Sequence, residues 1–298
     1  MLNEKNIPWT ERYRPNRVDG IVGDFRNKIK QYLLNSENMP HFLFYSTAPG
    51  TGKTSLAKAI IHELDCDALV INSSDDRKIE TVREKVKKFC ETKSSKIGKR
   101  RCVFLDEIDG MTRLSQEALR NTMETYQKNA FFILTANRVN KVIEPLQSRC
   151  QVIAFNYPNK LEVKNYLKMI CLNESIKFTE EGLDKLIEMN YPSIRNCVLA
   201  IQDLWIQKLD VSVDTVQPAN KIFEIFWQRI KERDWKGIKQ AVMEGTVDAR
   251  DLNYYFWEQS LKEENIKIIQ ITCRNERDIS LGADTKVILV TSLIEMCK

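Results

Sequence analysis

The sequence predicts an α/β domain with a mainly parallel sheet, followed by two smaller domains built only of helices. Two observations support this. Short β-branched or aromatic runs alternate with helical patterns through the first half of the chain, and the strand signal stops after Phe155. Such alternation is typical of a parallel sheet with helices on both faces. The chain has 298 residues, which is long enough for two or three domains with ample core.

The expected strands are short runs rich in β-branched, aromatic and other apolar side chains. They cover residues 42–46, 68–72, 102–105, 131–135 and 152–155. The helices expected between them cover residues 53–64, 79–90 and 115–127. We therefore assign residues 1–156 to the first domain.

The second domain begins after a short linker, Asn-Tyr-Pro-Asn at residues 156–159. Asn159 is placed to cap a helix, and Thr179 and Pro192 mark two further helix starts. These signals predict a small helical domain over residues 157–212.

The third domain, residues 213–298, follows a weaker linker and is also expected to be helical. Apolar residues recur there at helical spacing, and we interpret them as core packing, with part of the surface available as a subunit interface. One stripe comprises Ile222, Phe223, Phe226, Trp227 and Ile230, and another comprises Val287, Ile288, Val290, Leu293 and Ile294.

The composition is that of an ordinary globular protein, with 43% hydrophobic and 29% charged residues. No apolar run reaches 18 residues, so we expect no membrane span, and the N-terminal residues do not read as a secretory signal. The eight cysteines include no Cys-x-x-Cys pair, which argues against a disulfide framework or a zinc ribbon. This pattern fits a reducing cytoplasm.

Positive charge is concentrated in one stretch. Residues 83–101 hold nine lysines or arginines against two glutamates. A solvated helix face and a nucleic-acid contact both account for this pattern, and the sequence leaves the choice open.

The most informative motif lies at residues 42–54, where an apolar run breaks into a glycine-rich turn ending in Gly52-Lys53-Thr54. A strand, a loop and a helix in this order form the phosphate cradle of P-loop nucleotide hydrolases. Backbone N–H groups and the helix N-terminus attract phosphate, Lys53 is placed to reach its outer oxygens, and the Thr54 hydroxyl is placed to ligate Mg²⁺. Thr47 stands where the first glycine of the usual pattern would be.

Polar residues follow two further apolar strands. Asp106 and Glu107 end the strand at 102–105, and Asn137 ends the strand at 131–135. Ligands of α/β proteins bind at the carboxyl ends of such strands. Asp106 is placed to hold Mg²⁺, Glu107 to polarise an attacking water, and Asn137 to position that water, although a simple turn residue also accounts for Asn137.

Five motifs occur in order along the chain. They are Glu11-Arg12-Tyr13-Arg14-Pro15, the loop at 47–54, Leu105-Asp106-Glu107, Thr135-Ala136-Asn137 and Ser148-Arg149-Cys150. With this set of motifs the chain resembles AAA+ ATPases of the sliding-clamp-loader group, in the replication-factor-C-like branch. It is most similar to the large ATPase subunit of tailed-phage clamp loaders. The resemblance covers about the first 200 residues by motif.

The resemblance implies a domain plan and a set of site residues. Residues 1–156 would form the AAA+ domain, 157–212 a helical lid and 213–298 a helical collar for oligomerisation. The matched positions around the adenine and ribose are Thr10, Glu11, Arg12, Tyr13, Val18 and Val22. The matched positions of the phosphate loop are Gly50, Thr51, Gly52, Lys53, Thr54 and Ser55.

Further positions carry over from the family. Asn137 matches the sensor at the end of the fourth strand, and Arg149 matches the arginine finger that enters a neighbouring subunit's site. Arg195 matches the lid arginine that touches the phosphates of its own chain's ATP. The positions matched to DNA contact are Lys78, Arg83, Gln116 and Arg120; a solvated helix face accounts for these as well.

The resemblance implies an ATP- and Mg²⁺-dependent subunit that opens a sliding clamp and loads it onto primer–template DNA. Its partners would be further copies of itself and one distinct subunit in a five-membered ring, in the cytoplasm of the host if a phage encodes it. Two alternatives remain open. One is a helicase loader or branch-migration ATPase, and the other is a scaffold that binds ATP without hydrolysing it.

Overall fold

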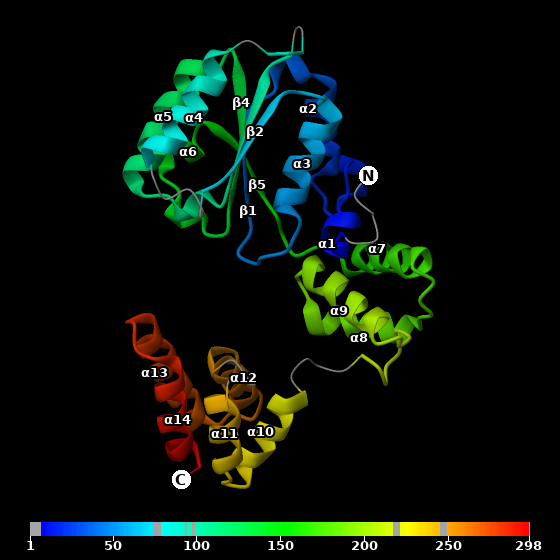
Figure 1. Cartoon of the computed structure of the whole chain (residues 1–298), viewed down its shortest axis with the longest axis vertical. Coiled ribbons are helices and arrows are strands. Elements are labelled where there is room, and N and C mark those ends of the chain that lie inside the picture. Colours follow the sequence, from blue (N-terminus) through cyan, green and yellow to red (C-terminus); the bar gives the residue numbers. More distant parts are fainter. Residues whose placement is uncertain are drawn as a thin grey trace. The chain divides into compact units, whose positions relative to one another are not determined.

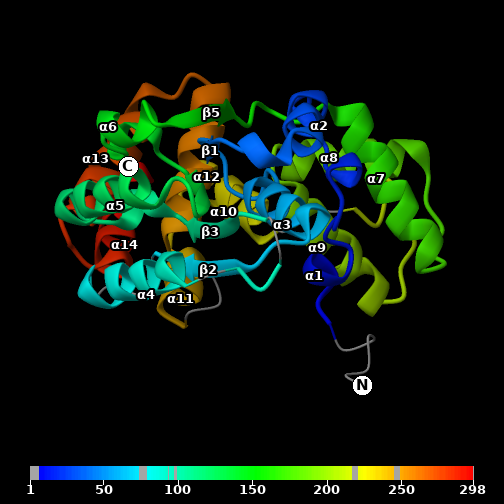
Figure 2. The same ribbon diagram turned by 90° about the horizontal axis from the view of Figure 1, so that it is seen from above.

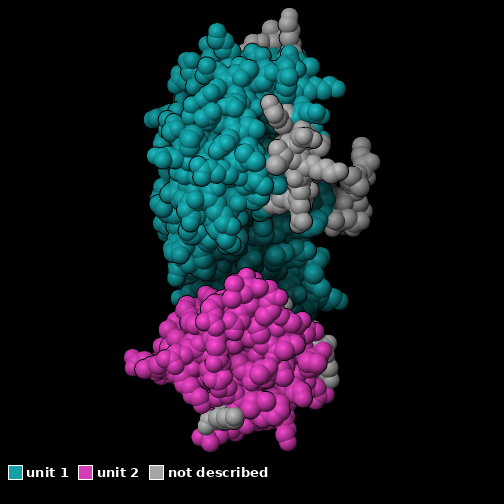
Figure 3. Space-filling view, turned by 90° about the vertical axis from the view of Figure 1, so that its left-hand side faces the viewer, with its two compact units in different colours: residues 1–216 teal, residues 217–298 magenta. Residues whose placement is uncertain are grey.

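The computed structural model describes residues 7–73, 79–92, 94–96, 99–216, 221–244 and 249–297. Within helices, the side chains of residues 79–83, 221, 222, 241 and 244 lie outside this description. The chain forms two compact units, residues 1–216 and residues 217–298, which Figure 3 colours separately. None of the described helices has the length and apolar character that crossing a lipid bilayer requires.

A five-stranded parallel sheet organises the first unit, in the order β2-β3-β4-β1-β5. The strands are β1 (His41–Tyr45), β2 (Ala68–Asn72), β3 (Arg101–Asp106), β4 (Ala130–Ala136) and β5 (Cys150–Ala154). The predicted α/β class and all five strands are thus confirmed, with shifts of up to two residues at their ends. β4 is buried along its whole length because it lies at the centre of the sheet.

Helices cover both faces of the sheet (Figure 1 and, from above, Figure 2). One face carries α2 (Arg26–Leu34) and α3 (Lys53–Leu64), and the other carries α4 (Ile79–Glu91), α5 (Arg113–Tyr126) and α6 (Glu144–Gln147). Side chains alternate along each strand, so Phe42 and Phe44 pack under α3 while Leu43 packs on the opposite side. The sheet is therefore packed between two apolar layers, one on each face.

Three further helices of the first unit form a separate apolar cluster: α7 (Lys160–Asn173), α8 (Glu180–Asn190) and α9 (Ile194–Ile206). The side chains of Asn159, Thr179 and Ser193 accept hydrogen bonds from backbone N–H groups in the first turns of these helices. The helix starts predicted at Asn159 and Thr179 are confirmed, and the third helix begins at Ile194, capped by Ser193.

The N-terminal helix α1 (Trp9–Arg12) packs against this helical cluster. Trp9 is 3% exposed, its ring centroid lies 5.3 Å from that of Trp205, and its backbone N–H donates to the Gln202 side chain. Tyr13 packs against the same cluster. The N-terminal segment therefore packs with these helices, although residues 13–159 separate α1 from the first of them in the chain.

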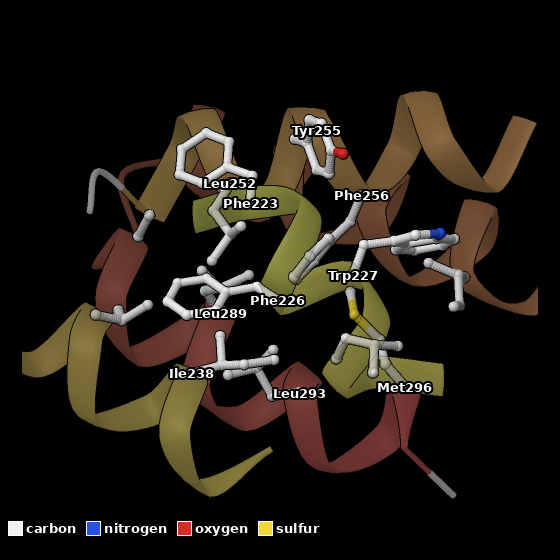
Figure 4. Close-up of a cluster of buried hydrophobic side chains, with 14 of the residues drawn as sticks. Phe223, Phe226, Trp227, Ile238, Leu252, Tyr255, Phe256, Leu289, Leu293 and Met296 are labelled. Atoms are coloured by element: carbon white, nitrogen blue, oxygen red, sulfur yellow. The ribbon is translucent and has the colours of Figure 1, made fainter. Parts of the chain in front are cut away.

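The second unit is helical, as predicted, with a core of its own (Figure 4). Its helices are α10 (Lys221–Lys231), α11 (Lys236–Glu244), α12 (Ala249–Lys262), α13 (Ile266–Ser280) and α14 (Thr285–Met296). Phe226 and Trp227 of α10 pack with Phe256, which confirms core packing for the described part of that stripe; the side chain of Ile222 lies outside the description. In α14 the core side chains include Leu293, whereas Val287 is 64% exposed.

The unit boundary differs slightly from the predicted one. The structure divides at residue 216, where the sequence predicted 212. Residues 213–216 stay with the first unit because Val216 is buried in the helical cluster of α7, α8 and α9. The further division of the first unit at residue 156 remains a prediction.

Candidate active site

The glycine-rich loop joins the end of β1 to the start of α3. Gly50 has φ 76° and Gly52 has φ 104°, in the left-handed region where a side chain is strained. α3 begins at Lys53, directly after Gly52. This turn leaves the first N–H groups of a 12-residue helix without partners inside the helix, which favours a bound anion.

Lys53 is almost buried beside this turn, at 8% exposure. Its Nζ lies 3.4 Å from the backbone carbonyl oxygen of Ala48. Burial lowers the pKa of Lys53, and the nearby carboxylates of Asp106 and Asp109 partly offset that effect. Because burial disfavours the charged ammonium, a phosphate bound beside it would stabilise that charge.

A carboxylate and two hydroxyls converge where β3 and β4 end. Thr54 Oγ1 donates to Asp106, at 3.0 Å from Oδ2 and 3.2 Å from Oδ1. The Thr135 hydroxyl also donates to Asp106, and it accepts from the backbone N–H of Glu107 at 2.9 Å. The carboxylate of Asp106, at the end of β3, thus links the start of α3 to the end of β4.

The residues after β3 have an unusual backbone. Glu107 has φ 58°, an uncommon conformation for a residue with a side chain. The chain then turns so that the Asp109 carboxylate accepts from the backbone N–H groups of Asn137 and Arg138, each at 3.2 Å. This fixes the backbone at the end of β4, from which Asn137 extends into the cavity.

The helical cluster approaches the loop from the opposite side. The backbone N–H of Arg195 donates to the Gly50 carbonyl at 3.3 Å. A Cβ added at Gly50 would lie 2.3 Å from Ser193 Oγ, so only glycine allows this contact. The start of α9 therefore packs directly on the phosphate loop.

A single cavity lies between these parts. Its lining comes from the N-terminal segment, the loop and α3, the ends of β3 and β4, and the helices α7 and α9. The lining residues are Thr10, Arg14, Pro15, Gly20, Ile21, Val22, Pro49, Gly50, Thr51, Gly52, Lys53, Thr54, Ser55, Asp106, Glu107, Thr135, Asn137, Tyr166, Ile194, Arg195 and Val198.

Most of the residues matched by resemblance lie at this cavity, but four of the adenine-side positions do not line it: Glu11, Arg12, Tyr13 and Val18. Val18 is fully buried in the core beneath the sheet, so it is not available for contact with a base. Val22 lines the cavity instead. Both valines are apolar and only four residues apart, and the sequence alone did not distinguish them.

Arg149 lies away from the cavity, at the junction of α6 and β5. It forms an ion pair with Glu124 and donates to the carbonyl oxygen of Pro145 at 2.8 Å, and its side chain remains 35% exposed. Its position is at the surface of its own chain.

The positions matched to DNA contact have different outcomes. Gln116 is 1% exposed, and its amide bonds to the backbone of Lys141 and Ile143, so it is not available to DNA in this structure. Arg120 is partly exposed and donates to the Asn121 side chain. Lys78 lies outside the described residues, and Arg83 belongs to α4 with its side chain outside the description.

Several cavity residues received no role from the sequence. Thr135 belongs to the Thr135-Ala136-Asn137 motif, but no sequence pattern indicates that its hydroxyl bridges Asp106 and Glu107. Arg14, which donates to Ser55 at 3.0 Å, belongs to the Glu-Arg-Tyr-Arg-Pro motif and was detectable there. Tyr166 and Val198 come from distant helices, and no local pattern marks them.

The donors present fit a magnesium ion. Thr54 and Asp106 bring a hydroxyl and a carboxylate within 3.2 Å of each other, and hard oxygen ligands of this kind are what Mg²⁺ takes in proteins. Mg²⁺ retains water and substrate oxygens, so two protein ligands suffice. Among the described residues, no cluster of three histidine, cysteine or acidic side chains forms a different metal site.

The fold and this site define a P-loop ATPase, and residues 42–157 match the model of the ATPase family associated with various cellular activities (AAA). The replication factor C small subunit of Archaeoglobus fulgidus is 36% identical over 251 residues, spanning 82% of this chain and 76% of that protein. The small subunit of Aeropyrum pernix is 39% identical over 201 residues, spanning 65% and 61%. The chain belongs to the replication factor C small-subunit family.

Solved structures agree on the fold. The RuvB Holliday junction branch migration motor of Thermotoga maritima superposes with a TM-score of 0.58, spanning 80% of this chain and 84% of that chain. Its sequence identity is 19%, so the likeness concerns architecture alone.

Proposed function

We propose that this chain is an ATPase subunit of a sliding-clamp loader, which opens the polymerase processivity clamp and loads it onto primer–template DNA. Hydrolysis then triggers release of the clamp. One observation carries the proposal: in a chain of the replication factor C small-subunit family, the phosphate loop, the Asp106–Glu107 pair and Arg195 surround one cavity. A site this complete supports an active subunit.

In this proposal each residue acts on one part of ATP. The loop N–H groups from Gly50 to Ser55 and the Lys53 ammonium hold the phosphates, and Arg195 approaches them from α9. Thr54 and Asp106 would hold Mg²⁺, which when bound would neutralise charge on the phosphates of ATP. Glu107 accepts a proton from the attacking water, and Asn137 orients that water.

Arg149 completes the site of a neighbouring copy. Its exposure supports this role, because release from Glu124 would free the guanidinium to reach another chain. An arginine supplied across an interface stabilises charge on the transferred phosphoryl group only when the subunits are correctly docked. The proposed assembly is a five-membered ring of such copies with one distinct subunit, joined through a collar formed by residues 213–298.

DNA contact is part of the proposal. We propose that Lys78, Arg83 and Arg120 contact DNA phosphates, whereas Gln116 acts indirectly, by holding the protein backbone at Lys141 and Ile143. The finer resemblance to the large subunit of tailed-phage clamp loaders leads us to propose action in the host cytoplasm.

The decisive test is the rate of phosphate release with and without sliding clamp and primer–template, after mixing with candidate partner subunits. We expect stimulation by both together, and Glu107→Gln should bind ATP yet release no phosphate, because it lacks the proton acceptor. Absence of turnover in every mixture, with ATP still bound, would favour the scaffold alternative. Glu107→Gln hydrolysing as fast as the unsubstituted chain would remove Glu107 from the mechanism.

The remaining alternative acts on a different ring. A helicase loader or branch-migration ATPase would retain a helicase or a junction, not the clamp. Capture of the chain by immobilised sliding clamp, in competition with a replicative helicase, separates these functions.

A further inference from the structure

The carboxylate of Glu174 connects the N-terminal segment to the helical cluster. Glu174 follows the last residue of α7, and its Oε1 accepts from both the Arg12 guanidinium and the Tyr13 hydroxyl. Burial and the adjacent Glu174 raise the pKa of Tyr13 to about 12, so the phenol remains protonated and donates. The side chains of Arg12 and Glu174 are only 23% and 15% exposed.

The residues held by Glu174 lie between cavity-lining residues. Thr10 and Arg14, on either side of the Arg12–Tyr13 pair, both line the cavity. The carbonyl oxygen of Tyr13 accepts from the hydroxyl of Tyr166 at 2.8 Å, and Tyr166 lines the cavity as well. A displacement of Arg12 and Tyr13 would therefore move this wall.

The cavity is lined by apolar and by polar groups. Val22, Ile194 and Val198 are apolar, and they belong to the same apolar cluster as Tyr13 and Tyr166. The phosphate loop instead presents N–H groups, and Lys53 and Asp106 line the cavity as well. Apolar side chains suit a flat heterocycle, and the loop suits a polyphosphate. The nucleoside of ATP would thus lie against side chains that pack with Tyr13.

We propose that Glu174 is a positioning residue for nucleoside recognition. By holding Arg12 and Tyr13, it keeps the N-terminal wall of the cavity in place against α7, and it does not touch the nucleotide. The inference rests on the proposed ATP site. It assigns a role at that site to Glu174, which belongs to none of the five sequence motifs. Glu174 also neutralises the positive charge of the Arg12 guanidinium, whose Nε is buried without a hydrogen-bond partner.

The test compares two ligands that share phosphates and differ in the nucleoside. Calorimetric titration of the full chain measures the Kd of ATP and the Kd of inorganic tripolyphosphate. Glu174→Ala should weaken ATP binding about tenfold, as expected for loss of a charge-assisted hydrogen bond, and leave tripolyphosphate binding unchanged. Glu174→Gln retains an acceptor for Tyr13 and should lose only about threefold.

The matched control is Asp184→Ala, which breaks a surface ion pair with Lys164 in the same helical cluster and should leave both Kd values unchanged. Equal weakening of both ligands by Glu174→Ala and Glu174→Gln would indicate a general structural role and overturn the inference, as would unchanged ATP binding. Failure of the unsubstituted chain to bind ATP would instead reject the proposed function.

Discussion

The Thr54 hydroxyl lies 3.0 Å from Oδ2 of Asp106, so the first turn of α3 and the end of β3 meet at one point. Because Thr135 donates to the same carboxylate, Asp106 accepts from two elements at once. Asp106 therefore links three elements of the site, α3, β3 and β4.

Replacing that side chain should impair both metal use and turnover. Asp106→Asn retains the shape but removes the negative charge, so we expect kcat to fall about 100-fold or more and the Mg²⁺ concentration for half-maximal rate to rise. Phosphate release measured over a Mg²⁺ titration checks this. Asp184→Asn, on the surface of α8, is the control and should leave both quantities unchanged; an unaltered Mg²⁺ dependence in Asp106→Asn would exclude a metal role.

We expect Lys53 to make ATP binding depend on pH. Burial lowers its pKa below the ordinary value of 10.5, so its charge is lost at lower pH than in a free lysine. Bound phosphate favours the charged form, and affinity for ATP should therefore fall as pH rises from neutrality through that lowered pKa. The stability of the nucleotide-free chain should change in the opposite direction. Below the lowered pKa, Lys53 is charged and its burial reduces the free energy of unfolding. This destabilisation is relieved as pH rises above the lowered pKa.

Calorimetric titration with ATP, from neutral pH up to the ordinary lysine pKa of 10.5, measures the effect. Lys53→Arg stays charged throughout this range and is the matched control. Parallel pH profiles for the two proteins would show that Lys53 does not titrate in the site.

Gly50 should be less tolerant of substitution than Gly52. Both have positive φ, but a Cβ at Gly50 would meet Ser193 Oγ at 2.3 Å, whereas the nearest atom to one at Gly52 is a carbon of Phe155 at 4.0 Å. We expect Gly52→Ala to destabilise the first unit by about 1–2 kcal/mol and Gly50→Ala by about 1–3 kcal/mol more. Thermal unfolding measures the loss of stability in each variant. Equal losses would show that Ser193 and α9 can shift away from residue 50 at little energetic cost.

Arg149 should matter only in the assembly. We expect Arg149→Ala to lower the stimulated rate of the complex by about 10³ or more while leaving the Kd of ATP unchanged. Arg113→Ala, at a highly exposed arginine of α5, is the control. Normal stimulated turnover by Arg149→Ala in the reconstituted complex would contradict the proposed role.

Local patterns were sufficient for the fold and for many of the residues that line the cavity. Apolar strands bounded by turns identified the sheet, Asp106 ends one of these strands, and Lys53 and Thr54 follow the glycine-rich turn. Other lining residues were harder to predict, because Tyr166 and Val198 come from helices more than 100 residues away from Thr54. Gln116 shows a second difficulty: a polar residue on a helix reads as exposed until its buried hydrogen-bond partners are known.

The packing of Trp9 on Trp205 offers a built-in optical reporter. The other tryptophans of the chain, Trp227, Trp235 and Trp257, all belong to the second unit. With those three changed to phenylalanine, the remaining indole emission would come only from the place where the N-terminal helix meets α9. Its wavelength and intensity would then report whether this contact changes when a nucleotide is added.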